Sequence, residues 1–157
     1  MSAEGPSHPH VIAPIGTAMN RPFSDVLDRL RGKGLRPTRQ RLALAKLLLE
    51  RGDVHVTAEE LHGMATKDGI RVSLATVYNT LHQFTDAGLL REIVVEAGRS
   101  YFDTNISDHH HFFHEHNAML SDIEGCDVSI ARLPEPPAGM QVSRVDVVIR
   151  LAPNKKS

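Results

Sequence analysis

The period of the hydrophobic residues changes near residue 89, and this change restricts the fold more than any other feature of the chain. Four earlier stretches carry apolar residues three or four positions apart, which is the spacing of an amphipathic helix. Residues 89–95 and 99–103 are instead strand-like, and Glu96-Ala97-Gly98 between them supplies a tight turn. Helices followed by a β-hairpin are the element order of a winged helix, so we expect an α+β fold.

Capping residues predict where the helices begin. Ser24 and Ser73 are suited to cap a helix N-terminus, and Thr57-Ala-Glu-Glu60 has the spacing of a capping box. In the last helix, Leu74 and Val77 are expected to face inward. The four expected helices cover residues 24–32, 37–52, 57–69 and 73–88.

The chain is expected to divide into a tail and two units. Residues 1–20 are rich in Pro, Gly and Ser and lack the pattern of a signal peptide, so we expect a disordered tail. We expect residues 21–104 to form an N-terminal winged helix-turn-helix domain that binds DNA, and residues 105–157 to form a small α/β dimerisation and metal-sensing domain. The second domain has expected strands at 118–123 and 142–151. Apolar strands in so small a unit favour a homodimer, because an unpaired strand edge is exposed.

Composition excludes several classes of protein. Apolar residues make up 41% of the 157, enough for a core, yet no apolar run approaches the ~20 residues that a membrane helix needs. The single cysteine, Cys126, excludes an intramolecular disulfide framework and a structural zinc site of four cysteines. We therefore expect a cytoplasmic protein without a membrane partner.

Basic residues are concentrated in the first portion of the chain. Residues 21–51 contain nine Lys or Arg against three acidic residues, although the net charge of the whole chain is -1. In a helix-turn-helix the second helix lies in the major groove of double-stranded DNA, and its first turns contact base edges. A solvated helix surface or a protein-binding module would share these features. The expected DNA contacts are Arg36, Arg39 and Arg41 near an early helix, Ser73, Ala75, Thr76, Tyr78 and Asn79 on the recognition helix, and Arg99 at the hairpin tip.

Five histidines fall within residues 109–116, a density that packing does not explain. Neutral imidazole is the commonest metal ligand, and neighbouring imidazoles repel each other when protonated. In an extended segment His109 and His111 point to one side and His110 to the other, so the first two can share one metal. A solvated loop with fortuitous metal affinity is the alternative. The expected ligands are His109, His111, Asp103, Asp122, and His55 in the loop between the second and third helices.

The donor set restricts the metal and the chemistry. Three imidazole nitrogens and two carboxylates suit Fe2+ or Mn2+ and tolerate Zn2+. His110, His114 and His116 are candidates for a second metal site or for haem, since haem iron accepts axial imidazole. A metallohydrolase needs three ligands, an open position and a general base. The only acid inside the cluster is Glu115 and no His-Glu-x-x-His motif occurs, so we do not expect an enzyme.

Several short motifs together resemble the ferric uptake regulator superfamily. They are Gly34-Leu-Arg-Pro-Thr-Arg-Gln-Arg41, Thr57-Ala-Glu-Glu-Leu61, Ser73-Leu-Ala-Thr-Val-Tyr-Asn-Thr-Leu81, Asp86-Ala-Gly-Leu-Leu90 and Tyr101-Phe-Asp103. The resemblance covers about Phe23 to Leu151, and its specificity lies in the combination of motifs. Further stretches look like the iron response regulator branch: Asp103-Thr-Asn-Ile-Ser-Asp-His-His-His111 and Leu133-Pro-Glu-Pro-Pro137 with Arg144-Val-Asp-Val-Val-Ile-Arg-Leu151.

The resemblance implies a dimer with a winged helix, a C-terminal dimerisation domain and a regulatory metal site between them. By position, that site falls on the five ligands proposed above, and the recognition helix falls on residues 73–87 with Tyr78 as the aromatic that contacts bases. Where the superfamily has its first Cys-x-x-Cys pair for structural zinc, this chain has His114 and Asn117, and the second pair is missing. Cys126 is not followed by the proline of a Cys-Pro haem motif, so haem would depend on histidines.

The expected function is an iron- or haem-responsive transcription regulator, mainly a repressor, that controls genes of iron and haem metabolism. Ligand occupancy would set the spacing of the two DNA-binding heads on an inverted-repeat operator, whose half-sites lie about one helical turn apart. The alternatives are a manganese-sensing repressor and a peroxide-sensing repressor. In the latter, an iron site of three histidines and two aspartates reacts with peroxide and oxidises its own ligand histidine.

Overall fold

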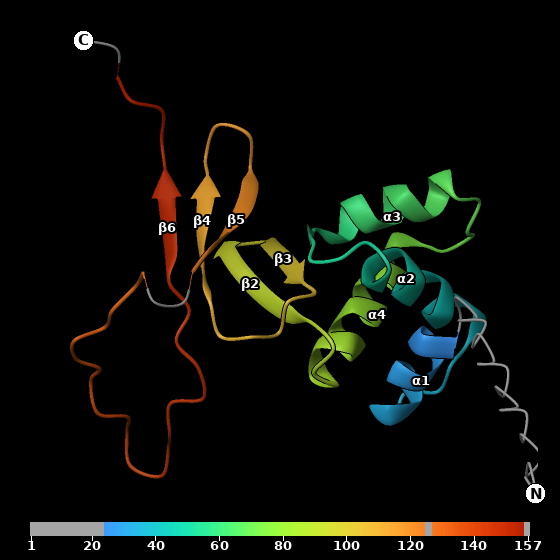
Figure 1. The fold of residues 1–157 in the computed structure, drawn as a ribbon, viewed down its shortest axis with the longest axis horizontal. Helices are drawn as coiled ribbons and strands as arrows, with labels where there is room; N and C mark the ends of the chain where they lie inside the picture. Colours follow the sequence, from blue (N-terminus) through green and yellow to red (C-terminus); the bar gives the residue numbers. More distant parts are fainter. Residues whose placement is uncertain (1–23, 125–126, 156–157) are drawn as a thin grey trace, which may run out of the picture.

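The computed structural model describes residues 24–124 and 127–155. The tail expected over residues 1–20 and the single cysteine, Cys126, lie outside this part of the chain. Four helices lie at one end of the molecule, a first three-stranded sheet follows them, and a second three-stranded sheet lies at the other end (Figure 1).

The four helices share one apolar core. Leu30, Leu48 and Leu81, from three different helices, are fully buried at its centre. The prediction of four helices is confirmed, although one begins at Arg39 rather than Pro37 because Thr38 caps it. Among the described residues, no helix has the length and apolar content that crossing a membrane requires. The helices are α1 (Ser24–Gly32), α2 (Arg39–Leu49), α3 (Ala58–Lys67) and α4 (Leu74–Asp86).

A complete capping box begins α3. The Thr57 hydroxyl accepts a hydrogen bond from Glu60 N, and the Glu60 carboxylate accepts one from Thr57 N at 2.8 Å. Thr57→Ala removes the first bond, so we expect the free energy of unfolding to fall by about 1 kcal/mol. Urea denaturation measures the loss. Thr66→Ala, at an exposed position of the same helix, is the control, and an equal loss in both variants would contradict the capping role.

The first sheet contains the predicted hairpin and one further strand that was not predicted from the sequence. The hairpin turns through Gly98, whose φ of 75° is a conformation that glycine adopts at little cost. The prediction that His55 lies in a loop is wrong, because His55 and Val56 pair with Asp103 and Phe102. The antiparallel order is β1 (His55–Val56), β3 (Arg99–Asp103), β2 (Arg91–Glu96).

The second sheet is built around the histidine-rich strand. β4 (His110–His114) pairs antiparallel with β5 (Met119–Ile123) and parallel with β6 (Val148–Leu151). The strand predicted at 118–123 is confirmed, whereas the one predicted over 142–151 is shorter. It is shorter because only four residues of β4 lie alongside it. The α+β class is confirmed, and within the described residues beyond 105 the chain contributes strands and loops.

The hairpin packs on both parts of the molecule. Its Phe102 enters the helical core, while Ile93 and Tyr101 form a second core with Phe113 and Leu120 of the second sheet. The Tyr101 hydroxyl also donates a hydrogen bond to the carbonyl of residue 118. β2 and β3 lie between the helices and the second sheet (Figure 1). There Asp103, the last residue of β3, lies within hydrogen-bond distance of His111, near the start of β4.

Candidate metal centre and nucleic-acid interface

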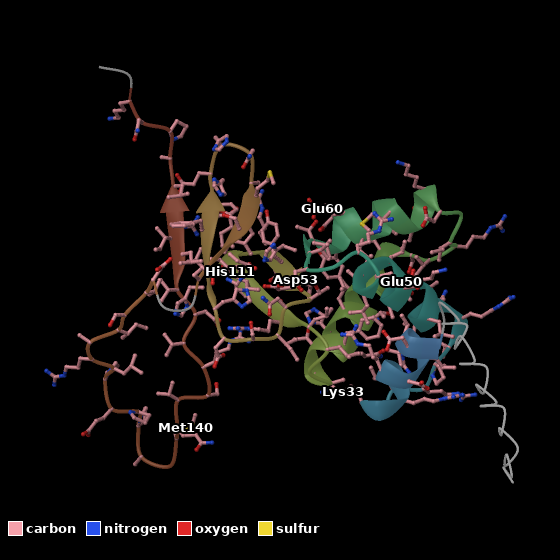
Figure 2. The ribbon with its side chains drawn as sticks, viewed as in Figure 1. Lys33, Glu50, Asp53, Glu60, His111 and Met140 are labelled. Atoms are coloured by element: carbon pink, nitrogen blue, oxygen red, sulfur yellow. The ribbon has the colours of Figure 1, made fainter. Side chains whose placement is uncertain are left out.

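Four of the five predicted metal ligands lie on strands of the two sheets, and the fifth directly precedes a strand. In the first sheet, His55 on β1 is paired with Asp103 on β3. In the second, His111 on β4 is paired with Asp122 on β5, and His109 lies immediately before β4. Side chains alternate along β4, which places those of residues 109 and 111 on one face. Figure 2 shows His111 where the second sheet faces the first.

The three imidazoles converge on one oxygen of each carboxylate. Their Nε2 atoms lie 2.8–3.2 Å from Asp103 Oδ2. The same atoms lie 2.7–3.4 Å from Asp122 Oδ1. One donor atom from each of the five residues lies within 4.8 Å of all the others. In the described part of the chain this is the only group of three or more His, Cys, Asp or Glu residues with such spacing.

Hydrogen bonds to the backbone orient two of these side chains. His109 Nδ1 lies 2.7 Å from the carbonyl oxygen of Ser107, which can only accept, so Nδ1 carries the proton and Nε2 is turned toward the cluster. The second oxygen of Asp103, Oδ1, accepts a hydrogen bond from Asn105 N at 2.8 Å. This leaves Asp103 Oδ2 directed at the histidines.

The cluster stabilises positive charge. Burial by itself would raise the pKa of Asp103, but hydrogen bonds with His111, with His55 and from Asn105 N outweigh it and hold that pKa well below its usual range. Burial would likewise lower the pKa of His55, yet its hydrogen bond with Asp103 and the charges of both carboxylates raise that pKa above the ordinary value. Two carboxylates beside three imidazoles therefore form a site suited to a cation.

The donor set fits a divalent first-row metal. Three imidazole nitrogens and two carboxylate oxygens, with no sulfur, match the preferences of Fe2+, Mn2+ and Zn2+. Asp103 and His111 are buried, while the side chain of Asp122 is 37% exposed and borders an open cavity with Asn105 and His109. An ion would reach the buried donors from this side.

Of the three other histidines of the cluster, one lies apart from the other two, whose rings are in contact. His110 Nδ1 accepts a hydrogen bond from Val147 N at 3.2 Å. His114 Nε2 lies 2.9 Å from Ser121 Oγ, and the rings of His114 and His116 are 6.0 Å apart in an edge-on arrangement. These positions do not support the prediction that all three histidines bind one haem or one second metal.

The first turns of α4 carry most of the residues predicted to contact base edges. Ala75 and Asn79 are exposed, Thr76 is half-buried, and Ser73 caps the helix by accepting a hydrogen bond from Thr76 N. The prediction that Leu74 faces inward is wrong, because its side chain is 36% exposed at the first position of the helix, ahead of the buried stripe.

Tyr78 and Arg41 each have a partner within the helical part. The Tyr78 hydroxyl donates a hydrogen bond to the Glu59 carboxylate at 2.7 Å, which raises the pKa of Tyr78 and lowers that of Glu59. The Arg41 guanidinium donates to Gln83 at 2.8 Å and to the Arg36 carbonyl at 2.9 Å. Arg41 therefore ties the start of α2 to α4, which is a structural role that the sequence did not indicate.

The remaining predicted DNA contacts lie on the surface. Arg36 and Arg39 are exposed near the start of α2. Arg99 is exposed at the hairpin tip, where it forms an ion pair with Glu96 at 3.2 Å. All three guanidinium groups are placed where a phosphate could reach them.

The groups that support the ligands were not predicted from the sequence. The Ser107 carbonyl and the Asn105 amide are backbone atoms, so residue types carry no signal for them. Arg91 on β2 is only 6% exposed, although arginine is a residue that is almost never fully buried unless paired. A charged residue at an inward position of an apolar strand is the signal that would have identified it.

Comparisons with known proteins identify the family of the chain. A family model described as the ferric uptake regulator family matches residues 32–148. A peroxide-responsive repressor PerR of Staphylococcus saprophyticus is 34% identical over 100 residues, which are 64% of this chain and 67% of the relative. A PerR of Staphylococcus aureus is 34% identical over 102 residues, 65% of this chain and 68% of the relative.

Solved structures share the fold. The ferric uptake regulator of Pseudomonas aeruginosa with manganese has a TM-score of 0.63 at 22% identity, covering 82% of this chain and 97% of its own. The ferric uptake regulator of Vibrio cholerae has a TM-score of 0.61 at 23% identity, and the match covers 79% of this chain and 96% of that protein. A zinc-bound manganese uptake regulator has a TM-score of 0.58 at 25% identity, and the match covers 82% of this chain and 98% of that protein. The likeness confirms the fold class expected from the sequence.

Proposed function

Because the chain belongs to the ferric uptake regulator family, we propose that it is a metal-dependent transcription regulator that binds double-stranded DNA as a homodimer in the cytoplasm. Residues 21–104 are proposed as the DNA-binding domain, and residues 105–157 as the dimerisation and metal-sensing domain. The proposed signal is Fe2+ or Mn2+, and the proposed action is mainly repression of genes of iron and haem metabolism.

The convergence of five donor atoms from two sheets carries this proposal. His55 and Asp103 belong to the sheet that packs on the helices, whereas His111 and Asp122 belong to the other sheet and His109 lies immediately before its strand β4. These side chains would hold the metal. When bound, a divalent cation would supply positive charge between the two carboxylates. Occupancy would therefore favour one arrangement of the two sheets, and in a dimer one spacing of the two DNA-binding heads.

The surface at the start of α4 is proposed to lie in the major groove. Ala75, Thr76, Tyr78 and Asn79 would face base edges, and Ser73 would lie beside them at the helix N-terminus. Arg36 and Arg39 would contact the DNA backbone, joined by Arg99 of the hairpin and by Arg41 if it exchanges its present partners.

Peroxide sensing is a second candidate, favoured by the staphylococcal relatives, which are named peroxide-responsive repressors. Iron bound by these histidines could react with peroxide, and one of the ligand histidines would be oxidised. Protein loaded with Fe2+ and treated with hydrogen peroxide would then carry an added oxygen on His55, His109 or His111. Mass spectrometry of peptides covering these residues tests the candidate, and unmodified peptides after treatment contradict it.

A hydrolase is not proposed. A catalytic metal site keeps three protein ligands and an open position, whereas five protein donors converge here. Haem is not included either, because the three candidate ligands do not form one site: His110 accepts a hydrogen bond from Val147 N, apart from the paired rings of His114 and His116.

Selection from a pool of random duplex DNA tests the proposal. With Mn2+ present, the protein is expected to enrich an inverted repeat whose half-sites lie about one helical turn apart. The same selection with a chelator is the control. Failure to enrich any sequence in either condition would contradict the proposed function.

A further inference from the structure

We propose that Arg91 is a positioning residue of the metal site, which holds the His109 imidazole through the carbonyl group of Ser107. The inference rests on the proposed metal site and extends it to a side chain outside the ligand set. Arg91 lies on β2 directly opposite Asp103 of β3. Directly paired residues of a sheet project from the same face, so Arg91 stands beside the ligand cluster.

A single carbonyl oxygen joins the arginine to the ligand. Arg91 Nη1 donates a hydrogen bond to Ser107 O, and His109 Nδ1 lies 2.7 Å from the same oxygen. The arginine fixes the position of this oxygen, and the oxygen in turn retains the proton on His109 Nδ1. His109 Nε2 is then left with its lone pair for a metal, 2.8 Å from Asp103 Oδ2.

Asp146 anchors the other side of the guanidinium. Arg91 Nη2 donates to Asp146 Oδ1 at 2.9 Å, and Asp146 Oδ2 accepts from Arg144 Nε at 2.7 Å. The next carbonyl along the chain, that of Val147, accepts a hydrogen bond from His111 N. Arg91 is thus held between the loop that precedes His109 and the segment that leads into β6.

The burial of Arg91 destabilises the fold, so its hydrogen bonds call for an explanation. Its side chain is 7% exposed, and Nε is buried without a hydrogen-bond partner among the described residues. A buried donor without an acceptor destabilises a protein, and an apolar side chain of similar volume would avoid that cost. The guanidinium is explained by what its two terminal nitrogens hold in place, namely the Ser107 carbonyl and Asp146.

The test uses the full chain, Co2+ as the probe, and proton NMR of the loaded protein in water. A histidine that binds Co2+ through Nε2 keeps an exchangeable proton on Nδ1, and the NMR signal of this proton is strongly shifted. The signal that disappears in the His109→Gln variant is assigned to His109. Arg91→Gln is expected to speed exchange of this proton with water at least about tenfold. The affinity for Co2+ is expected to fall about 10–100-fold, the range found when groups that orient metal ligands are removed.

Two further variants separate positioning from a structural role. Asp146→Asn removes a charge but keeps an oxygen that can accept from Arg91 Nη2, so the bond from Arg91 to Ser107 should persist. Its Co2+ affinity is expected to stay within about threefold of the wild type, with slow exchange at His109. Arg91→Lys keeps the charge but has a single nitrogen for two acceptors. It is expected to show faster exchange at His109 than the wild type, which decides the matter if Arg91→Gln does not fold.

The outcomes distinguish this inference from the proposed function. If wild-type protein gives no shifted histidine signals with Co2+, the metal site itself is wrong and the inference falls with it. If the wild type binds Co2+ and both Arg91 variants keep wild-type exchange at His109, only the positioning role is overturned. Equal loss of affinity in Asp146→Asn and Arg91→Gln with unchanged exchange would also overturn it, since that result indicates general destabilisation.

Discussion

Asp103→Asn is expected to lower the affinity of the protein for Mn2+ by more than about 100-fold. Asp103 Oδ2 is the atom on which three imidazole nitrogens converge, and the side chain is fully buried. An amide in its place removes a negative charge and offers a weaker donor, so the loss should exceed the about 10–100-fold cost of removing an orienting group. Isothermal titration calorimetry measures the affinity directly.

Asp28→Asn is the matched control for this variant. It makes the same chemical change at an exposed position of α1, at the far end of the molecule from the second sheet (Figure 1). Its Mn2+ affinity should equal that of the wild type. Unchanged affinity in Asp103→Asn would mean that the cluster is not the site of binding.

Phe84→Ala is expected to lower the free energy of unfolding by about 3–5 kcal/mol. Phe84 on α4 is 1% exposed and is among the largest fully buried side chains of the helical core. Truncation removes buried apolar surface and leaves a cavity that the surrounding helices fill only in part. Since a domain is stable by about 5–15 kcal/mol in total, DNA binding should fail at temperatures that the wild type tolerates. Urea denaturation followed by circular dichroism measures the change.

Phe112→Ala is the control for the core variant. Phe112 lies on β4 and is only half-buried, so the same truncation should cost clearly less. Equal losses in the two variants would show that the helical core does not dominate the stability of the protein.

Local signals predicted most of the first part of the fold. Ser73, Thr57 and the glycine of the hairpin turn act within a few residues of themselves, and each lies where its local chemistry predicts. β1 was missed because two residues are too few to establish a period. The strand expected over 142–151 was too long because its extent depends on how much of β4 lies alongside it, which the strand's own sequence does not contain.

The candidate site also combines residues that a local pattern predicts with contacts that join distant parts of the chain. The pairing of His109 with His111 follows from alternation along one strand, and donor chemistry together with the family resemblance drew attention to His55, Asp103 and Asp122. The contact between His55 and Asp122 joins residues 67 positions apart, which no local pattern encodes. Arg91 could not be placed beside the site from sequence alone, because its partner Asp146 is 55 positions away and its other acceptor is a backbone carbonyl.

The central claim is that metal bound by this cluster controls DNA binding. Fluorescence anisotropy with a labelled operator duplex, taken from the selection experiment, measures the Kd for DNA with Mn2+ and with a chelator at the same ionic strength, since affinity for DNA depends strongly on salt. We predict a Kd at least about tenfold lower with Mn2+, in the range typical of coupling between two sites, and no such difference in Asp103→Asn. The same Kd for the wild type in both conditions would contradict the claim.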